Sequence, residues 1–488
     1  MSQQNPVSAP ITTTTTTLAQ RRLGVWAIVF FVVSAAAPLT VVASAAATDF
    51  RLAGIGGPGA MLASGVVLIL FASGFTAMSR YVRNTGAFYV YGARGLGKPI
   101  GIGIVFVTIF SYAALCICFY GFVGFFGEMT FAALFGIELP WTVYAVLALV
   151  IVGVLGYRKI DVGAKVLAVL LTAEVAILLV LAVAVLAQGG PEPISFASFA
   201  PENVFFAAGS GALFVFGFGA YLGFESTAIY TEEAKDPART VPAATYISIA
   251  FLAVFYAFTF WILTVAFGID GVLELALRDD FQDMVFHAGD QYLGAWAGVA
   301  MRVLIVTSFF ACLLAFHNAS SRYLFSMGRE RLLPAWLAQT QPATQAPHHA
   351  SMTMSFLSLA AIVVTLLSGA DPFLGFALPV YSIGVAGLVF AQAVAAIAVV
   401  GFFLRDRRGH SPWRVIVAPA LGALGLIVGW VLIAMNFDLV TGLTGPVNLA
   451  LLAPTPLLFL AGIVAGFVLR ARSPRHYAEL TMLVPDEE

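Results

Sequence analysis

Two acidic residues lie deep inside apolar stretches of the sequence, where a charged group needs a chemical reason. Glu174 stands in the middle of the stretch 166–187, and Glu225 follows a glycine-rich segment within the stretch 204–231. A carboxylate in hydrocarbon is costly unless it binds a proton or a partner. We therefore interpret each acid in two ways. It either carries a proton or balances a cationic solute, or it is a neutral group that hydrogen-bonds to nearby backbone and holds helices together.

Helix-breaking residues interrupt two of the apolar stretches near their centres. Pro38 lies in the segment S-A-A-A-P-L-T, and Gly217, Gly219 and Gly223 lie in F-G-F-G-A-Y-L-G-F-E. Proline cannot donate to its helix and clashes with the preceding turn, and each glycine weakens a helix by up to ~1 kcal/mol relative to alanine. Paired interruptions indicate a binding site, because unwound turns expose peptide groups to a solute. Alternatively, the proline only kinks its helix and the glycines allow close helix packing.

Other polar and aromatic side chains occur at similar depth in two further stretches. Tyr112, Cys116 and Phe119 share one helix face through their spacing of four and three residues. The second group is F-H-N at 316–318. A lone histidine is more often a packing residue than a ligand, and the phenylalanines can equally belong to a core.

The cysteines and histidines are not spaced for a metal site, a disulfide or a catalytic centre. Cys116, Cys118 and Cys312 are odd in number and lie in apolar stretches, so we expect small buried side chains. The six histidines show no metal-ligand spacing. We therefore expect no metal, no cofactor and no catalytic residue.

The composition places all of these residues in a membrane protein. Of the 488 residues, 60% are hydrophobic and 10% are charged, against roughly 25% charged in an average soluble domain. Many apolar stretches exceed the ~18 residues that mark a spanning helix, and they do not alternate as barrel strands do. We predict an all-α polytopic membrane protein with twelve transmembrane helices. They are expected near 23–48, 58–79, 99–127, 139–157, 166–187, 204–231, 243–269, 293–321, 351–370, 373–404, 413–436 and 447–470.

The positions of lysine and arginine predict the orientation of these spans. With the N-terminus in the cytosol, all of them fall on the cytoplasmic side or its edge except Arg51, Arg278 and Arg302. An odd number of spans would place the basic cluster at 405–408 on the wrong side. We therefore predict a multi-pass protein of the inner (cytoplasmic) cell membrane, with both termini in the cytosol and the lipid bilayer as its surroundings. The net charge of −1 gives no indication of nucleic-acid binding.

Three motifs resemble the amino acid–polyamine–organocation (APC) superfamily of permeases. G-F-E at 223–225, followed by E-E-A-K-D-P-A-R-T-V-P at 232–242, resembles the signature after the sixth span of that family. N-T-G-A-F-Y-V-Y with G-L-G-K-P, at 84–99, resembles the loop between its second and third spans. S-S-R-Y-L-F-S-M-G-R-E-R-L-L-P, at 320–334, resembles the end of its eighth span. The motifs occur in the family's order and spacing.

This resemblance implies a leucine-transporter (LeuT) fold, in which two inverted repeats of five helices are followed by two additional helices. The implied division is a disordered cytosolic tail at 1–22, a first repeat at 23–187, a second repeat at 204–404, two additional helices at 413–470 and a cytosolic tail at 471–488.

The resemblance also implies a substrate held between the breaks of the first and sixth spans. Ala36, Ala37 and Pro38 would present backbone to a substrate carboxylate. Residues 217–221 would face its amino group, with Phe218 or Tyr221 as an aromatic gate. The expected substrate-binding residues are Ala36, Ala37, Pro38, Tyr112, Cys116, Phe216, Gly217, Phe218, Gly219, Ala220, Tyr221 and Phe316, and the expected coupling residues are Glu174 and Glu225.

We predict from these features a secondary active transporter, not an enzyme, that imports an amino acid by alternating access. A proton is the expected coupling ion, with sodium as the other candidate. A carrier of amines or polyamines is an alternative, because two buried acids also suit a cationic solute, and an amino acid exchanger is another. An enzyme would need a nucleophile–base pair or a metal set at depth, and a sensor would need a soluble output domain. A channel is compatible with the composition.

Overall fold

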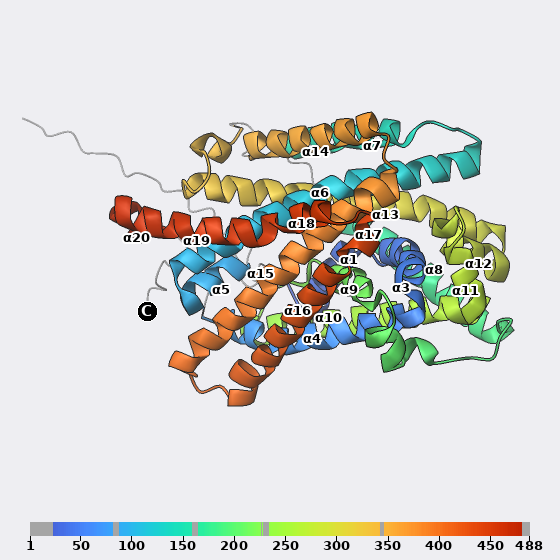
Figure 1. Cartoon of the computed structure of the whole chain (residues 1–488), viewed down its shortest axis with the longest axis horizontal. Helices are drawn as coiled ribbons and strands as arrows, with labels where there is room; N and C mark the ends of the chain where they lie inside the picture. Colours follow the sequence, from blue (N-terminus) through green and yellow to red (C-terminus); the bar gives the residue numbers. More distant parts are fainter. Residues whose placement is uncertain are drawn as a thin grey trace, which may run out of the picture.

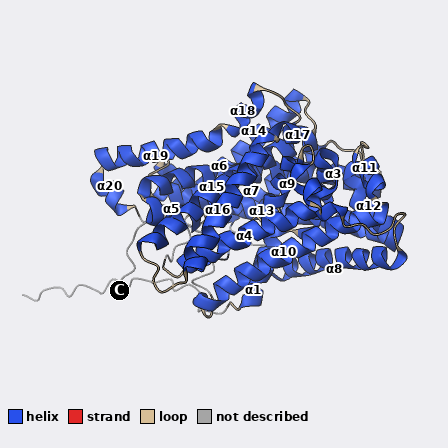
Figure 2. Ribbon diagram, turned by 60° about the horizontal axis from the view of Figure 1, so that its bottom comes forward, coloured by secondary structure: helices blue, strands red, loops and turns tan. Residues whose placement is uncertain are grey.

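Long apolar helices make up most of the chain, because a helix in hydrocarbon satisfies its own backbone hydrogen bonds. The computed structural model describes residues 23–81, 87–158, 164–225, 227, 234–341 and 346–480. Within those residues the chain consists of helices and loops, as Figure 2 shows. The predicted tail at 1–22 and residues 481–488 of the predicted C-terminal tail lie outside the described residues.

Each predicted span coincides with a helix or a short series of helices. The first is divided into α1 (Val25–Ala36), α2 (Pro38–Val41), a π-helical turn (Val42–Ala46) and α3 (Ala47–Ala53). The others are α4 (Gly57–Met78), α6 (Lys98–Phe135), α7 (Trp141–Arg158), α8 (Ala164–Gln188), α9 (Ser210–Gly219), α10 (Pro237–Phe267), α13 (Ala295–Arg329), α14 (His348–Ser368), α15 (Leu378–Arg405), α16 (Ala418–Met435) and α19 (Pro454–Arg472). Shorter helices are α5 (Ala87–Leu96), α11 (Ile269–Ala276), α12 (Met284–Leu293), α17 (Phe437–Thr441), α18 (Pro446–Leu452) and α20 (Pro474–Glu479).

The all-α polytopic class is confirmed by the length and composition of these helices. Among the described residues, nine helical segments are long and apolar enough to cross a membrane, and Trp141–Gly156 and Ser210–Gly219 are shorter apolar helices. The segment Val25–Met78 counts once among the nine although it contains the first two predicted spans. The number twelve and the division into two repeats stay predictions.

Burial separates central helices from peripheral ones. In α10 and α15, 78% of the most apolar window is buried by other helices, whereas in α19 the share is 17%. The central helix α6 packs against α5, α7, α13, α15 and α19, and Figure 1 shows it crossing the middle of the molecule. Large apolar side chains on peripheral helices are exposed, including Leu367 on α14 and Leu460 on α19. Such surfaces are expected where a helix faces lipid.

One end of the helix bundle joins segments that the charge pattern predicts to be cytosolic. The Lys98 ammonium group at the start of α6 donates to the Tyr477 carbonyl oxygen in α20 at 2.6 Å. Arg80, after α4, donates to the carbonyl oxygen of Ala238 in α10 at 2.6 Å. Figure 1 shows α5 and α20 at this end. This grouping agrees with an even number of membrane crossings between Lys98 and Tyr477, and between Arg80 and Ala238.

The opposite end carries α3, α11 and α12 (Figure 1). There the Arg51 guanidinium donates to the carbonyl oxygens of Ala276 at 2.9 Å and Arg278 at 3.2 Å. Arg302 forms an ion pair with Asp283 at 2.6 Å. The three basic residues that the sequence places outside therefore occur together at this end.

Glycines bring α19 and α6 into close backbone contact. A Cβ atom added to Gly462 would lie 2.6 Å from Gly103 Cα and 2.7 Å from the Ile102 carbonyl oxygen. Small residues at such crossings let helix backbones approach, which is how helices associate in a membrane.

Replacing Gly462 with leucine is expected to destabilise the protein, because the new side chain meets backbone atoms that cannot rotate away. We expect a loss of about 1–3 kcal/mol, the usual cost of overpacking. Thermal unfolding of the purified variant in detergent measures it. The control is Val464→Leu on the same helix, where the wild-type side chain is 60% exposed. Equal unfolding temperatures for the two variants would contradict this packing.

Candidate functional site

The first span is interrupted at Ala37, as the position of Pro38 predicts. Helix α1 ends at Ala36, Ala37 adopts a left-handed conformation (φ 45°, ψ 75°), and α2 starts at Pro38. Proline disfavours a right-handed helical conformation in the preceding residue, which explains why the chain turns there. A left-handed conformation costs a residue with a Cβ about 1–2 kcal/mol. The surrounding structure must therefore hold this turn in place.

Glu174 binds the backbone directly after this interruption. The Leu39 amide N–H, which has lost its partner one turn earlier, donates to Glu174 Oε2 at 3.3 Å. Glu174 lies on α8 and is 3% exposed. Its carboxyl group thus acts on the first span as a cap would act on a helix N-terminus.

The sixth span is also interrupted, directly after α9. Helix α9 ends at Gly219, and turns follow that include Gly223 with φ at 101°. The Gly223 amide N–H donates to Glu225 Oε2 at 3.0 Å, and the Tyr112 hydroxyl of α6 donates to Glu225 Oε1 at 2.7 Å. Both oxygens of this carboxyl group therefore have partners, one of them at the break itself.

The two interruptions face each other. A Cβ atom added to Gly223 would lie 3.1 Å from the Ala35 Cβ. The last carbonyl groups of α1 are bound by other helices: the Ala36 oxygen accepts from the Tyr256 hydroxyl at 3.2 Å, and the Ala35 oxygen accepts from the Cys312 thiol at 3.9 Å. The unwound turns thus share one region of the bundle, between α8, α10 and α13.

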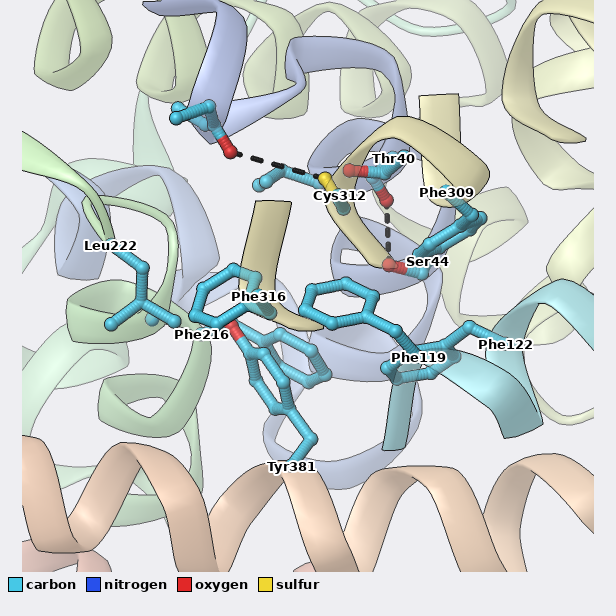
Figure 3. Close-up of a pocket in the computed structure, with 14 residues that line it drawn as sticks. Thr40, Ser44, Phe119, Phe122, Phe216, Leu222, Phe309, Cys312, Phe316 and Tyr381 are labelled. Carbon is cyan, nitrogen blue, oxygen red and sulfur yellow. Dashed lines mark hydrogen bonds between the residues drawn. The ribbon is translucent and has the colours of Figure 1, made fainter. Parts of the chain in front are cut away.

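A cavity lies between the broken helices (Figure 3). Its lining comes from both interruptions and from α6, α13 and α15. The lining residues are Ala35, Ala36, Thr40, Val41, Ser44, Phe119, Phe122, Phe216, Gly219, Leu222, Phe309, Cys312, Phe316 and Tyr381. None of these described residues carries a charge, and six of them are aromatic.

Aromatic rings form the walls of the cavity. The ring centroids of Phe119 and Phe316 are 5.1 Å apart. Phe216 and Tyr381 are stacked with centroids 5.4 Å apart, and Figure 3 shows these two rings together below the Phe316 ring. These separations lie in the range in which aromatic pairs add stability beyond their buried area.

Hydroxyl groups of the first span supply polar atoms to the cavity. Thr40 Oγ1 donates to the Ala37 carbonyl oxygen at 2.7 Å. Ser44 Oγ donates to the Thr40 carbonyl oxygen at 2.6 Å, as Figure 3 shows. The spacing of four residues places both on one face of the helix. Their oxygen lone pairs can accept hydrogen bonds from an ammonium group in the cavity.

The structure brings only part of the predicted binding residues to this cavity. Ala36, Phe216, Gly219 and Phe316 line it. Ala37, Pro38 and Ala220 are buried but are not among the lining residues.

The other predicted binding residues contact neighbouring helices instead. Tyr112 binds Glu225, and Cys116 Sγ lies 3.9 Å from His317 Nδ1. A Cβ atom on Gly217 would lie 2.7 Å from Ser64 Oγ in α4.

Neither of the two predicted gate residues faces the cavity. Phe218 packs against Phe214, with ring centroids 6.1 Å apart, and against Gly429 of α16. The Tyr221 hydroxyl donates to the Met61 carbonyl oxygen at 2.6 Å. The aromatic residues of the broken helix and its neighbour that do face the cavity are Phe216 and Tyr381.

Several lining residues are not among the predicted binding residues. Phe309 and Cys312 precede the predicted Phe316 at intervals of three and four, which puts all three on one face of α13. That spacing was available from the sequence. Tyr381 gave no such signal, because it stands in an apolar stretch without a second aromatic residue on the same face.

Comparison with known proteins decides the family. A family model described as "Amino acid permease" matches residues 23–468. The chain belongs to the amino acid permease family. The resemblance to the APC superfamily is thereby confirmed, and the protein is a membrane transporter rather than an enzyme.

Relatives of this permease include transporters that are named for different substrates. An uncharacterized transporter of Mycobacterium tuberculosis is 25% identical over 352 residues, 72% of each chain. The branched-chain amino acid permease BcaP of Bacillus subtilis is 25% identical over 357 residues, 65% of this chain and 70% of its own. The chloroplastic cationic amino acid transporter 7 of Arabidopsis thaliana is 28% identical over 178 residues, 36% of this chain and 28% of its own.

A solved structure confirms the architecture of the permease. A manganese transporter of Eremococcus coleocola superposes with a TM-score of 0.54 over 93% of this chain and 96% of its own, at 14% identity. At that identity the likeness concerns the fold alone. It supports the predicted LeuT-type arrangement of helices.

Replacing Glu174 tests whether its carboxyl group holds the first break. Glu174→Ala leaves the buried Leu39 N–H without an acceptor and is expected to lower stability by about 1–3 kcal/mol. Glu174→Gln retains an acceptor oxygen and is expected to cost less. Thermal unfolding in detergent compares them. Equal losses for both variants would show that the N–H group finds another partner.

Replacing Gly219 tests the position of the cavity. A Cβ atom there would collide with the Tyr381 hydroxyl and lie 3.1 Å from Val385 Cγ2. We expect Gly219→Ala to push the Tyr381 ring into the cavity and to reduce the initial rate of uptake by about tenfold or more, since small displacements of binding groups have effects of this size. The control is Gly153→Ala in α7, where the nearest atom is 3.7 Å away. Unchanged uptake by Gly219→Ala would place the substrate elsewhere.

Proposed function

We propose that this permease imports a neutral amino acid with an apolar side chain, driven by a proton gradient, through alternating access. The observation that carries the proposal is the cavity between the two broken helices, whose described lining is aromatic, small and uncharged. An apolar amino acid side chain would lie against the aromatic rings, and the hydroxyl groups of Thr40 and Ser44 would bind its ammonium group.

The same lining argues against a cationic substrate such as a polyamine. A desolvated cation needs an opposite charge or many acceptors. The acids nearest the breaks, Glu174 and Glu225, bind the amide groups of Leu39 and Gly223 and are not among the cavity-lining residues. BcaP is named as a permease of branched-chain amino acids, which agrees with an apolar substrate.

Alternating access would use the interruptions as hinges. The half-helices on either side of Ala37 can tilt separately, because no continuous hydrogen-bond ladder joins them. At one end, Arg51 ties α3 to the carbonyl oxygens of α11 and its exit. Opening that end would require these hydrogen bonds to break. We propose that this end of the bundle faces the outside of the cell and that both chain termini lie in the cytosol. The protein would then reside in the inner membrane.

Coupling to a proton is proposed because carboxyl groups are buried in the bundle and can bind a proton there. Glu174 and Glu225, the expected coupling residues, accept hydrogen bonds from peptide N–H groups at the breaks. Sodium remains the alternative ion, and an exchanger the alternative mode.

Uptake into proteoliposomes tests this proposal. Radiolabelled L-leucine, L-alanine and L-phenylalanine are compared with L-arginine and putrescine, with the external solution either more acidic than the interior or at equal pH. We expect accumulation of at least one neutral amino acid only under the acidic external condition, and none of arginine or putrescine.

The other outcomes assign the rival functions. Accumulation of arginine or putrescine would support the cationic carrier, and dependence on a sodium gradient would replace the proton. Uptake only against a preloaded internal amino acid would identify an exchanger. No transport of any compound would refute the proposal.

A further inference from the structure

A third carboxyl group lies buried in the bundle, and it differs from the other two in having no hydrogen-bond partner within the part of the chain that the structure describes. Asp49 on α3 is 1% exposed. Neither Oδ1 nor Oδ2 has a hydrogen-bond partner among the described residues. Asp49 lies just beyond the predicted first span (23–48) and is not among the coupling residues expected from the sequence. A buried carboxylate without a partner is costly, and binding a proton removes that cost.

The packing around Asp49 is apolar and close. A Cβ atom added to Gly57, at the start of α4, would lie 3.0 Å from Asp49 Oδ2 and 3.3 Å from the Phe260 ring of α10. The carboxyl group and the ring therefore both pack against this glycine.

Charged and titratable groups on the surrounding elements do not neutralise Asp49. On its own helix, Arg51 binds the carbonyl oxygens of Ala276 and Arg278. In the turn Phe281–Asp283, Asp283 pairs with Arg302. The acids of α11 (Asp270 and Glu274) and those that follow it (Asp279 and Asp280) are exposed, and α9 carries no ionisable side chain.

Asp49 lies close to the cavity. Helix α3, which carries Asp49, directly follows the π-helical turn Val42–Ala46 and packs against it. The π-helical turn Val42–Ala46 separates Asp49 from the break at Ala37, and its Ser44 lines the cavity. Isolated π-helical turns are rare and occur frequently at functional sites.

The surroundings suit a proton better than a metal ion. A metal site needs several ligands, and the described residues contain no group of three or more His, Cys, Asp or Glu side chains that could hold one. A proton needs a single carboxyl group. Asp49 provides that group at the end of the bundle where Arg51 ties α3 to α11.

We propose that Asp49, rather than the two acids that bind the breaks, carries the proton that drives uptake. When the outer half of the first span tilts outward, Asp49 meets water and exchanges a proton. When the span closes, the carboxyl group returns to its apolar packing, which favours closure with the proton bound. A ligand shifts a conformational equilibrium by its different affinity for the two states, and here the proton is that ligand. This inference rests on the proposed transport function.

Asp49→Asn tests the role because the amide has the shape of the carboxylic acid but cannot exchange a proton. Reconstituted protein is assayed with radiolabelled L-leucine in two ways, by accumulation under an inward proton gradient and by counterflow against preloaded unlabelled L-leucine. We expect the variant to lose gradient-driven accumulation and to retain counterflow. Asp280→Asn, which removes an exposed acid near the same end, is the control and should retain both.

The two assays separate failure of this inference from failure of the transport proposal. If wild-type protein accumulates L-leucine and Asp49→Asn accumulates it equally, Asp49 does not carry the coupled proton. If Asp49→Asn loses counterflow as well, Asp49 is needed for transport itself and the proposal is likewise overturned. If the wild type shows neither activity, the proposed function fails, and this inference fails with it.

A measurement on the unmodified chain keeps the proposal testable if Asp49→Asn does not fold. Dicyclohexylcarbodiimide, an apolar reagent, adds to protonated carboxyl groups, and mass spectrometry of peptides locates the adduct. During L-leucine uptake at acidic external pH we expect labelling of Asp49 together with loss of accumulation. Loss of accumulation with label elsewhere and none on Asp49 would overturn the proposal.

Discussion

A peptide group that has left a helix inside a membrane must find another partner, and this requirement governs the centre of the permease. The interruption at Ala37 leaves the Leu39 N–H group free, and Glu174 from α8 accepts its hydrogen bond. In the turns after α9, the Gly223 N–H group donates to Glu225. Each acid is costly on its own in hydrocarbon, and so is each broken turn. Together they form a stable arrangement that keeps both helices open beside the cavity.

The cavity that results is lined mainly by apolar side chains. Its walls are rings from α6, α9, α13 and α15, and its hydroxyl groups come from the first span. Because the lining carries no charge among its described residues, selection within it depends on shape and on a few hydrogen bonds rather than on charge. This separates the cavity from the acids, which lie behind it and hold the backbone.

The three buried carboxyl groups therefore have different surroundings although their chemistry is the same. Glu225 has a partner on each oxygen, Glu174 binds one amide, and Asp49 has no partner among the described residues. A carboxyl group with fixed partners stabilises one arrangement of the chain. A carboxyl group without partners is stable in an apolar environment only when it is protonated. The free-energy cost of ionising it therefore changes as the surrounding helices open and close. The packing of Gly57 and Phe260 around Asp49 is what creates that difference.

The amino-acid sequence by itself determined the membrane class, the approximate helices, the two interruptions and the family. Hydropathy and helix-breaking residues act locally, so Pro38 and the glycines before Glu225 could be interpreted without knowing their neighbours. Of the binding residues predicted from the sequence, Ala36, Phe216, Gly219 and Phe316 line the cavity. Tertiary structure alone decided which side chains face the cavity. Successive residues of a helix point about 100° apart, so Phe216 and Phe218 lie on nearly opposite faces of α9, and the way the helix is rotated in the bundle decides which of them faces the cavity. Likewise, Tyr381 reaches the cavity only when α15 packs against α6 and α9, and Asp49 is buried only when Gly57 and Phe260 come together beside it, because burial depends on neighbours that are distant in the chain.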